Sequence, residues 1–301
     1  MRAFLIIAAL SVCLLPRLAL ALDYQVAVEP LEGEAVIAED LQQLILDAVL
    51  LEQLREQGAP SRFVLDRRAK DDVARVQDVL RSRGFYAGRV MIAIGEGDQP
   101  VVTISVATGE AYQIGRIVIQ DSTGGDLGAL STDDLGIASG DTALASAVIA
   151  AEPAGVTALR AQGYALARAA DRRVTVNHET QQLNLRYRFD PGPLVTLGKV
   201  SLDGLQDVAP ITVMRRVDIT EGQVFNPATL SGMRGAINEL GVFDSVTVQL
   251  SGLRAVDRSA EQVELPVEII VSERKFRTIG GGVSLSTDEG FGVEARWRHR
   301  N

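Results

Sequence analysis

Gly109-Glu-Ala-Tyr-Gln-Ile-Gly-Arg-Ile-Val-Ile119 is the stretch that decides the fold, because it recurs as Gly192-Pro-Leu-Val-Thr-Leu-Gly-Lys-Val-Ser-Leu202. The two copies start 83 residues apart, and in each a second glycine follows the first by six positions. Apolar residues then occupy every second position, at Ile117 and Ile119 in the first copy and at Val200 and Leu202 in the second. A period of two predicts a β-strand with one buried face. The recurrence predicts a structural repeat of about 80 residues.

A second motif places a glycine four positions after an apolar residue that ends a run with helical spacing. It occurs three times, at Gly84, Gly163 and Gly241, and an apolar or aromatic residue follows each glycine. Glycine is favoured just beyond a helix C-terminus, where the backbone is left-handed. We therefore expect each unit to have a helix that ends at this glycine and two strands that follow it. These strands are predicted at Arg89 to Ile94 and Val101 to Val106, Arg173 to Val176 and Leu183 to Phe189, and Ser245 to Leu250 and Val263 to Val271.

Each unit is predicted to have the order strand, helix, helix, strand, strand. In the third unit, Asn226-Pro227 is typical of an N-cap followed by proline at the first helical position. A layer of two helices over a small mixed sheet buries the apolar faces of such a unit, so the predicted class is α+β. The predicted units are residues 22–108, 109–191 and 192–272.

The first 21 residues have the pattern of a secretory signal peptide. Arg2 precedes an apolar run that ends at Leu15, and Ala19-Leu20-Ala21 is an A-x-A cleavage signal. The run is too short for a membrane helix. The single cysteine, Cys13, would be removed by cleavage, which suits an oxidising compartment. The net charge of −9 argues against nucleic acid as a partner.

Residues 273–301 show a different alternation. Val283 and Leu285, and after a turn Phe291, Val293 and Trp297, lie on one face, whereas the other face is small, polar or charged. This pattern predicts a lipid-facing hairpin of a β-barrel, although periodicity alone fits a soluble hairpin equally well. Two strands cannot close a barrel, so we expect further strands beyond Asn301.

The repeats resemble POTRA domains, and three of them before a barrel resemble TamA-type members of the outer-membrane protein insertase superfamily. The run Arg277-Thr-Ile-Gly-Gly-Gly-Val-Ser-Leu-Ser-Thr-Asp-Glu-Gly-Phe-Gly292 is similar to the segment that opens the barrel in that family. The resemblance implies three tandem POTRA (β-α-α-β-β) domains in the periplasm, followed by the first hairpin of an outer-membrane barrel. It also implies a TamB-like periplasm-spanning partner, unfolded outer-membrane or autotransporter clients, and contact with outer-membrane lipid.

Two candidate sites accompany this interpretation. A strand at a sheet edge can accept a strand from another chain, and the predicted edge nearest the membrane comprises Ser245, Val246, Thr247, Val248, Gln249 and Leu250. Gly280, Gly281 and Gly282 would weaken the first barrel strand and make it a seam that opens to clients; a simple bend at glycine is an equal alternative.

No catalytic or cofactor motif is present in the sequence, so neither an enzyme nor a bound cofactor is expected. The two histidines, His178 and His299, have no partner at metal-ligand spacing. The acidic pairs Asp71-Asp72 and Asp133-Asp134 are expected near helix starts, where negative charge is favourable. The alternatives to a TamA-like subunit are a general barrel-assembly insertase, a two-partner secretion pore and a soluble periplasmic POTRA scaffold.

Overall fold

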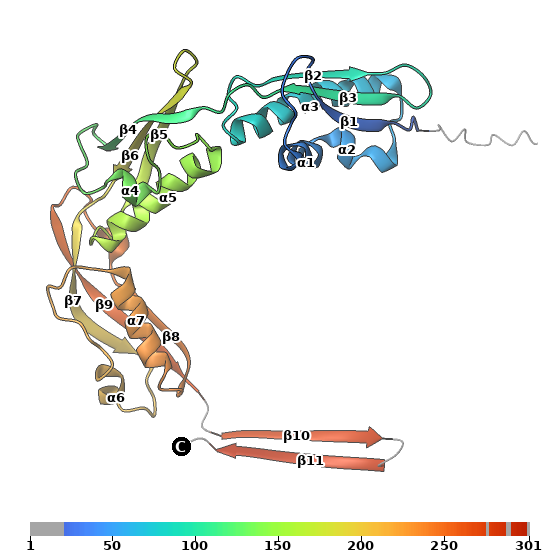
Figure 1. The fold of residues 1–301 in the computed structure, drawn as a ribbon. Coiled ribbons are helices and arrows are strands. Elements are labelled where there is room, and N and C mark those ends of the chain that lie inside the picture. Colours follow the sequence, from blue (N-terminus) through green and yellow to red (C-terminus); the bar gives the residue numbers. More distant parts are fainter. Residues whose placement is uncertain (1–20, 275–276, 287–289, 300–301) are drawn as a thin grey trace, which may run out of the picture. The chain divides into compact units, whose positions relative to one another are not determined.

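The computed structural model describes residues 21–274, 277–286 and 290–299 (Figure 1). The order strand, helical segments, strand, strand occurs three times and is followed by a two-stranded hairpin. The predicted α+β class with three tandem β-α-α-β-β repeats is therefore confirmed. Of the predicted cleavage signal, Ala19 lies outside the described residues and Ala21 lies within them.

The first repeat has a three-stranded sheet in the order β1-β3-β2, with β1 parallel and β2 antiparallel to the central strand. Alternation along β3 buries Val102, Ile104 and Val106 in the same core as the helices, as a strand with one covered face requires. The elements are β1 (Gln25–Pro30), α1 (Glu39–Ala48), α2 (Leu50–Gln53), the 3-10 turn η1 (Arg55–Gln57), α3 (Arg62–Ser82), β2 (Arg89–Ile94) and β3 (Val101–Ala107).

The expectation that Asp71 and Asp72 lie near the start of their own helix is wrong, because both lie in the middle of α3. Asp72 is fully buried, and its carboxylate accepts hydrogen bonds from the backbone N–H groups of Leu50 and Leu51, at 3.0 and 2.8 Å. It therefore caps the first turn of α2, a different helix, whose free N–H groups need acceptors. Tyr24 holds the same turn by donating its hydroxyl to the carbonyl of Leu51 at 2.7 Å.

The second repeat has the sheet order β4-β6-β5. Helix α5 approaches the central strand so closely that a Cβ added at Gly155 would lie 2.6 Å from a ring carbon of Phe189. The other acidic pair lies where it was predicted: Asp134 forms a capping box with Ser131 at the start of α4. The elements are β4 (Gln113–Asp121), α4 (Thr132–Leu135), α5 (Ala145–Ala161), β5 (Arg168–Asn177) and β6 (Gln182–Asp190).

The third repeat has the sheet order β7-β9-β8, with β7 parallel and β8 antiparallel to β9. The predicted cap is confirmed: the side chain of Asn226 accepts a hydrogen bond from the N–H of Ala228, and Pro227 is the first residue of α7. The elements are β7 (Leu194–Asp203), α6 (Pro210–Met214), α7 (Pro227–Asn238), β8 (Phe243–Leu250), the 3-10 turn η2 (Leu253–Ala255) and β9 (Gln262–Glu273).

The glycines predicted to end helices have the expected backbone. Gly84, Gly163 and Gly241 have φ of +92°, +108° and +69°, a left-handed conformation that glycine adopts without steric cost. Backbone bonds that fold back over the helix end accompany the first two, because Phe85 donates to the carbonyl of Leu80 at 2.9 Å and an equivalent bond follows Gly163.

The described residues form two compact units. The first comprises those up to Gly115 together with 140–146 and 176–183, and the second comprises 116–139, 147–175 and those from Asn184 onward. The division runs through the second repeat, so its segments 140–146 and 176–183 belong to the first unit. The predicted repeat boundaries at 109 and 192 remain predictions.

Candidate functional site

Strand β8, which contains the predicted pairing edge, lies at one side of its sheet, where β9 is its only neighbour in the sheet order. Val246, Val248 and Leu250 stand opposite Val271, Ile269 and Val267 and lie on the core side. Ser245, Thr247 and Gln249 are exposed on the other face. The described part of β8 thus offers one row of backbone donors and acceptors beyond its pairing with β9, and such a row accepts an added strand.

The start of β8 is fixed by contacts around Asp244. Arg274 donates its Nε–H to the Asp244 carboxylate at 2.7 Å, and its backbone N–H donates to the carbonyl of Val242 at 2.8 Å. A register shift between Phe243 and Ser245 marks the same point. Farther along, Gln249 donates to the Glu268 carboxylate at 2.8 Å on the exposed face of the sheet. The edge is therefore a positioned strand, which lowers the entropy lost when a second strand pairs with it.

The first repeat has an equivalent edge that includes a cleft, which the sequence did not single out. Edge strand β2 and helix α3 enclose a cleft of about 250 Å³. Arg62 closes one end of it by donating to the carbonyls of Ile94 and Gly95 at 2.9 and 2.7 Å. The lining residues are Arg62, Asp66, Ala69, Lys70, Val73, Ile92 and Ile94.

Consecutive repeats are joined by the same backbone bond. The N–H of Tyr112 donates to the carbonyl of Gly84 at 2.9 Å, and the N–H of Val195 donates to the carbonyl of Gly163 at 2.9 Å. In both joints, the residue three positions after the opening glycine bonds the glycine that ends the preceding helix. The two motifs found separately in the sequence are therefore the two halves of one joint.

Side chains reinforce the second of these joints. Asp190 accepts hydrogen bonds from Arg168 and Arg258 at 3.0 and 3.1 Å, and Arg258 also donates to the carbonyl of Leu166 at 3.0 Å. Burial alone would raise the pKa of Asp190, but the two guanidinium groups outweigh it and hold that pKa below its usual value. The carboxylate is therefore ionised at neutral pH.

A cluster of aromatic rings reinforces the first joint. Tyr86 donates its hydroxyl to the carbonyl of Ala143 at 3.3 Å, and its ring centroid lies 5.6 Å from that of Tyr112. The Tyr112 hydroxyl is 2.8 Å from Nδ1 of His178. His178, predicted to lie in a turn without metal partners, thus makes a structural contact.

The terminal hairpin pairs β10 (Arg277–Ser286) with β11 (Gly290–His299) in antiparallel register. The register sets Ile279, Gly281, Val283 and Leu285 opposite Trp297, Ala295, Val293 and Phe291. The described side chains on this face, those of Val283, Phe291, Val293, Ala295 and Trp297, are apolar. Val283, Phe291, Val293 and Trp297 are between 67% and 72% exposed. The side chain of Leu285 lies outside the described residues.

At Gly281 and Gly282 of the predicted seam, no neighbouring atom lies so close that only glycine fits. An added Cβ at Gly281 or Gly282 would meet its nearest neighbour at 3.8 or 3.9 Å, which is ordinary contact. By contrast, an added Cβ at Gly292 would lie 2.7 Å from the Ser284 hydroxyl. Gly280 stands opposite Arg296 in the register. Larger residues therefore fit at positions 281 and 282.

The described part of the chain contains no group of three or more histidine, cysteine or acidic residues that could hold a metal ion. Within the same residues, no helix is long and apolar enough to cross a membrane.

Comparison with known proteins finds similar solved structures but no matching family. No family model and no curated protein sequence matches the chain. The crystal structure of POTRA domains 3–5 of BamA from Haemophilus influenzae is 17% identical with a TM-score of 0.43, and the match covers 86% of this chain and 100% of that one. BamA from Haemophilus ducreyi lacking POTRA domains 1–3 is 18% identical with a TM-score of 0.44, over 61% of this chain and 34% of that one. CdiB from Acinetobacter baumannii is 14% identical with a TM-score of 0.26, over 61% and 35%.

Proposed function

We propose that this chain is the periplasmic arm of an outer-membrane protein assembly or translocation machine, and that its repeats bind unfolded clients by strand addition. The observation that carries the proposal is the recurrent edge: β2, β5 and β8 each lie at the edge of a three-stranded sheet beside a central strand. Backbone hydrogen bonds form with any extended sequence, so such edges suit clients that differ in their side chains.

The terminal hairpin supports a position at the outer membrane. Its apolar face would contact lipid through Val283, Leu285, Phe291, Val293 and Trp297, and further strands would be needed to close a barrel. Gly280, Gly281 and Gly282 would form a weak seam that admits client strands. Replacing Gly281 and Gly282 with threonine, in a protein with a whole barrel, tests the seam: unchanged client assembly would rule it out.

The strand-addition step is tested by proline substitution in β8. Successive backbone N–H groups of a strand point to opposite sides, so proline at Thr247 and proline at Val248 remove donors on different sides. One variant loses a bond to β9 and the other loses a bond available to a client. A single cysteine introduced at Gln249 can carry a photo-crosslinker, because the only natural cysteine is Cys13.

The probe is a urea-denatured outer-membrane barrel protein diluted onto the full chain. We expect the variant with unchanged circular dichroism to lose most of its crosslinking, and the same cysteine without proline to retain it. Full crosslinking in both proline variants would show that β8 is not the client edge.

The narrower proposal is a TamA-like subunit that docks a TamB-like partner and passes autotransporter-type clients to its barrel. It rests on the resemblance of residues 277–292 and on the number of repeats. Calorimetry with a purified TamB-like partner tests it. Absence of binding, with client crosslinking intact, would favour a general barrel-assembly insertase or a two-partner secretion pore. A soluble periplasmic scaffold would not place its hairpin in lipid vesicles.

A further inference from the structure

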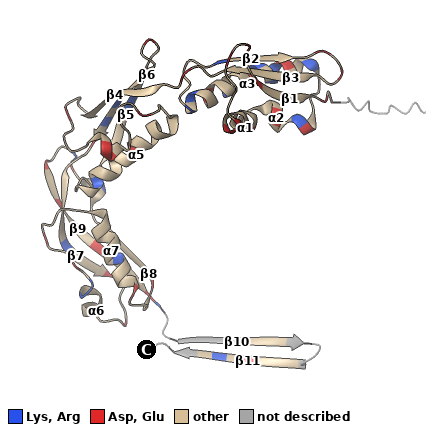
Figure 2. Cartoon of the chain, viewed as in Figure 1, with Lys and Arg blue, Asp and Glu red and all other residues tan. Residues whose placement is uncertain are grey.

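The uncovered face of the second sheet is basic, in a chain whose net charge is −9. Along the central strand β6, Leu183, Leu185, Tyr187 and Phe189 are buried, so Arg186 and Arg188 project from the opposite face. On the neighbouring strand β5, Arg172 contacts Glu152 of helix α5 at 2.7 Å and therefore lies on the helix side. Its neighbour Arg173 thus projects from the same face as Arg186 and Arg188. Figure 2 shows blue segments, which mark Lys and Arg, on the strands of the second repeat. We call Arg173, Arg186 and Arg188 the arginine face.

Among the described residues, none of these three arginines forms an ion pair. The Nε atoms of Arg186 and Arg188 are shielded from solvent and have no hydrogen-bond partner. An acceptor from another chain would therefore bind these guanidinium groups through their Nη atoms, not through Nε. Asp171 shares the face and is the nearest acidic residue along β5.

Among the described residues, the nearby turn forms no ion pair with the arginine face. Arg188 extends over Gly124, where an added Cβ would lie 3.7 Å from its Nη2 atom. Asp121 starts this turn, but its Oδ1 already accepts from the N–H and hydroxyl of Thr123 and from the N–H of Gly125, at 2.8, 2.6 and 2.9 Å. These bonds, with that of the Thr123 hydroxyl foremost, lower the pKa of Asp121. The carboxylate is thus engaged within its own turn.

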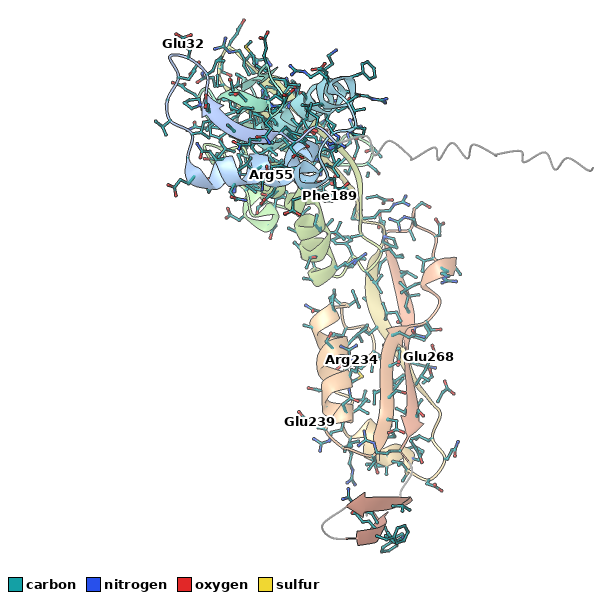
Figure 3. The ribbon with its side chains drawn as sticks, turned by 90° about the vertical axis from the view of Figure 1, so that its right-hand side faces the viewer. Glu32, Arg55, Phe189, Arg234, Glu239 and Glu268 are labelled. Atoms are coloured by element: carbon teal, nitrogen blue, oxygen red, sulfur yellow. The ribbon has the colours of Figure 1, made fainter. Side chains whose placement is uncertain are left out.

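The fold does not require a basic face here, because the central strands of the other two repeats carry other types of residue on the corresponding face. In the first repeat, β3 presents Thr103 and Ser105 on its uncovered side. In the third repeat, β9 presents Glu268 on its uncovered side. Figure 3 labels Glu268 on the side of the sheet away from helix α7, and it labels Arg234 on that helix. Equivalent positions on the central strands therefore carry hydroxyl, guanidinium and carboxylate groups. Of the three central strands, only β6 therefore carries arginines on this side.

The geometry points to the arginine face as a docking surface for an acidic, extended segment of another protein. Guanidinium groups bind carboxylates through two parallel hydrogen bonds. Arg186 and Arg188 are two positions apart on one strand, roughly 6.6 Å at 3.3 Å per residue, which equals the spacing of alternate side chains in an extended peptide. Carboxylates at every second position would meet both arginines, and β5 places Arg173 about 4.8 Å to the side.

The test uses the full chain and a fluorescent twelve-residue peptide of alternating glutamate and valine, with a glutamine and valine peptide as reference. We expect the triple variant R173Q/R186Q/R188Q to bind the glutamate peptide at least tenfold more weakly than the natural chain. The matched control R215Q/R234Q/R254Q removes the same charge from the third repeat and should leave affinity within twofold. A benzophenone in the peptide should crosslink the natural chain on β5 and β6, a readout that needs no variant.

Several results would overturn the proposal: an equal loss in both triple variants, no preference for the glutamate peptide, or crosslinks outside the second repeat. Binding to vesicles of anionic phosphatidylglycerol without binding to the peptide would identify a lipid surface instead. Concentration-dependent self-association that R173Q/R186Q/R188Q abolishes, without peptide binding, would identify a second copy of the chain as the occupant. The variant R173K/R186K/R188K keeps the charge and should recover part of the affinity, which separates binding from a folding defect.

Discussion

Replacing Asp72 with alanine should destabilise the first repeat more than any surface change in the same helix. The substitution leaves the N–H groups of Leu50 and Leu51 without their acceptor in a fully buried site, and it removes the partner of Arg75, whose Nε lies 3.2 Å from the carboxylate. Each buried N–H left unpaired costs about 1–3 kcal/mol. Because the two losses share one cap, we expect a total of roughly 3–5 kcal/mol, within the roughly 2–6 kcal/mol that two buried N–H groups would cost if they lost their acceptors independently.

The assay is hydrogen exchange measured by mass spectrometry on the full chain, followed over the peptide that contains Leu50 and Leu51. A loss of 3 kcal/mol corresponds to an exchange rate about 150-fold faster, since 1.4 kcal/mol is a factor of ten. The matched control is Asp71→Ala, the exposed neighbour on the same helix, which should change stability by no more than about 0.5 kcal/mol. The reasoning fails if the Asp72 variant exchanges at the same rate as the Asp71 variant.

Two further predictions concern the joint between the second and third repeats. Gly163→Ala would place a Cβ 2.5 Å from a methyl carbon of Val224 at a φ of +108°, so we expect a loss of about 2–4 kcal/mol in urea unfolding, whereas Gly241→Ala, with open space around it, should lose only about 1 kcal/mol. Equal losses would mean that the joint does not pack tightly. The pKa of Asp190 is lowered, so the stability from its ion pairs is fully present above the unfolded value near 3.9 and is lost as pH falls through the folded value. Arg258→Ala should move the carbon-13 titration of Asp190 toward higher pH, lower the stability of the joint at neutral pH and make that stability depend less on pH near pH 4; an unchanged titration would exclude Arg258 as a cause.

Local patterns in the sequence predicted most of the strands and helix ends. Period-two apolar positions predicted the two later strands of each repeat, because an uncovered sheet face needs polar residues at alternate positions. Glycines that follow runs with helical spacing predicted where three helices end. Few other residues adopt the left-handed backbone found at Gly84, Gly163 and Gly241 at so low a cost. Asn226-Pro227 predicted the start of α7 for the same local reason.

Contacts between distant segments could not be predicted in this way. The sequence predicted Asp72 near the start of its own helix, but the residue caps α2, because the fold carries α3 past a helix start 22 residues away. The cleft beside β2 and the arginine face also depend on which strands become neighbours. Neither has a signature in the order of residues along the chain.

The sequence by itself determined the repeat, its α+β class, the helix-ending glycines and the two-faced hairpin, because each depends on backbone preferences and side-chain alternation over a few residues. Only the tertiary structure decided that each repeat-opening segment bonds the glycine that ends the preceding helix, that β2 and β5 lie at sheet edges as was predicted for β8, and that three arginines gather on one uncovered face. Those features depend on strand order and on chain crossings, which bring together residues that no local pattern connects.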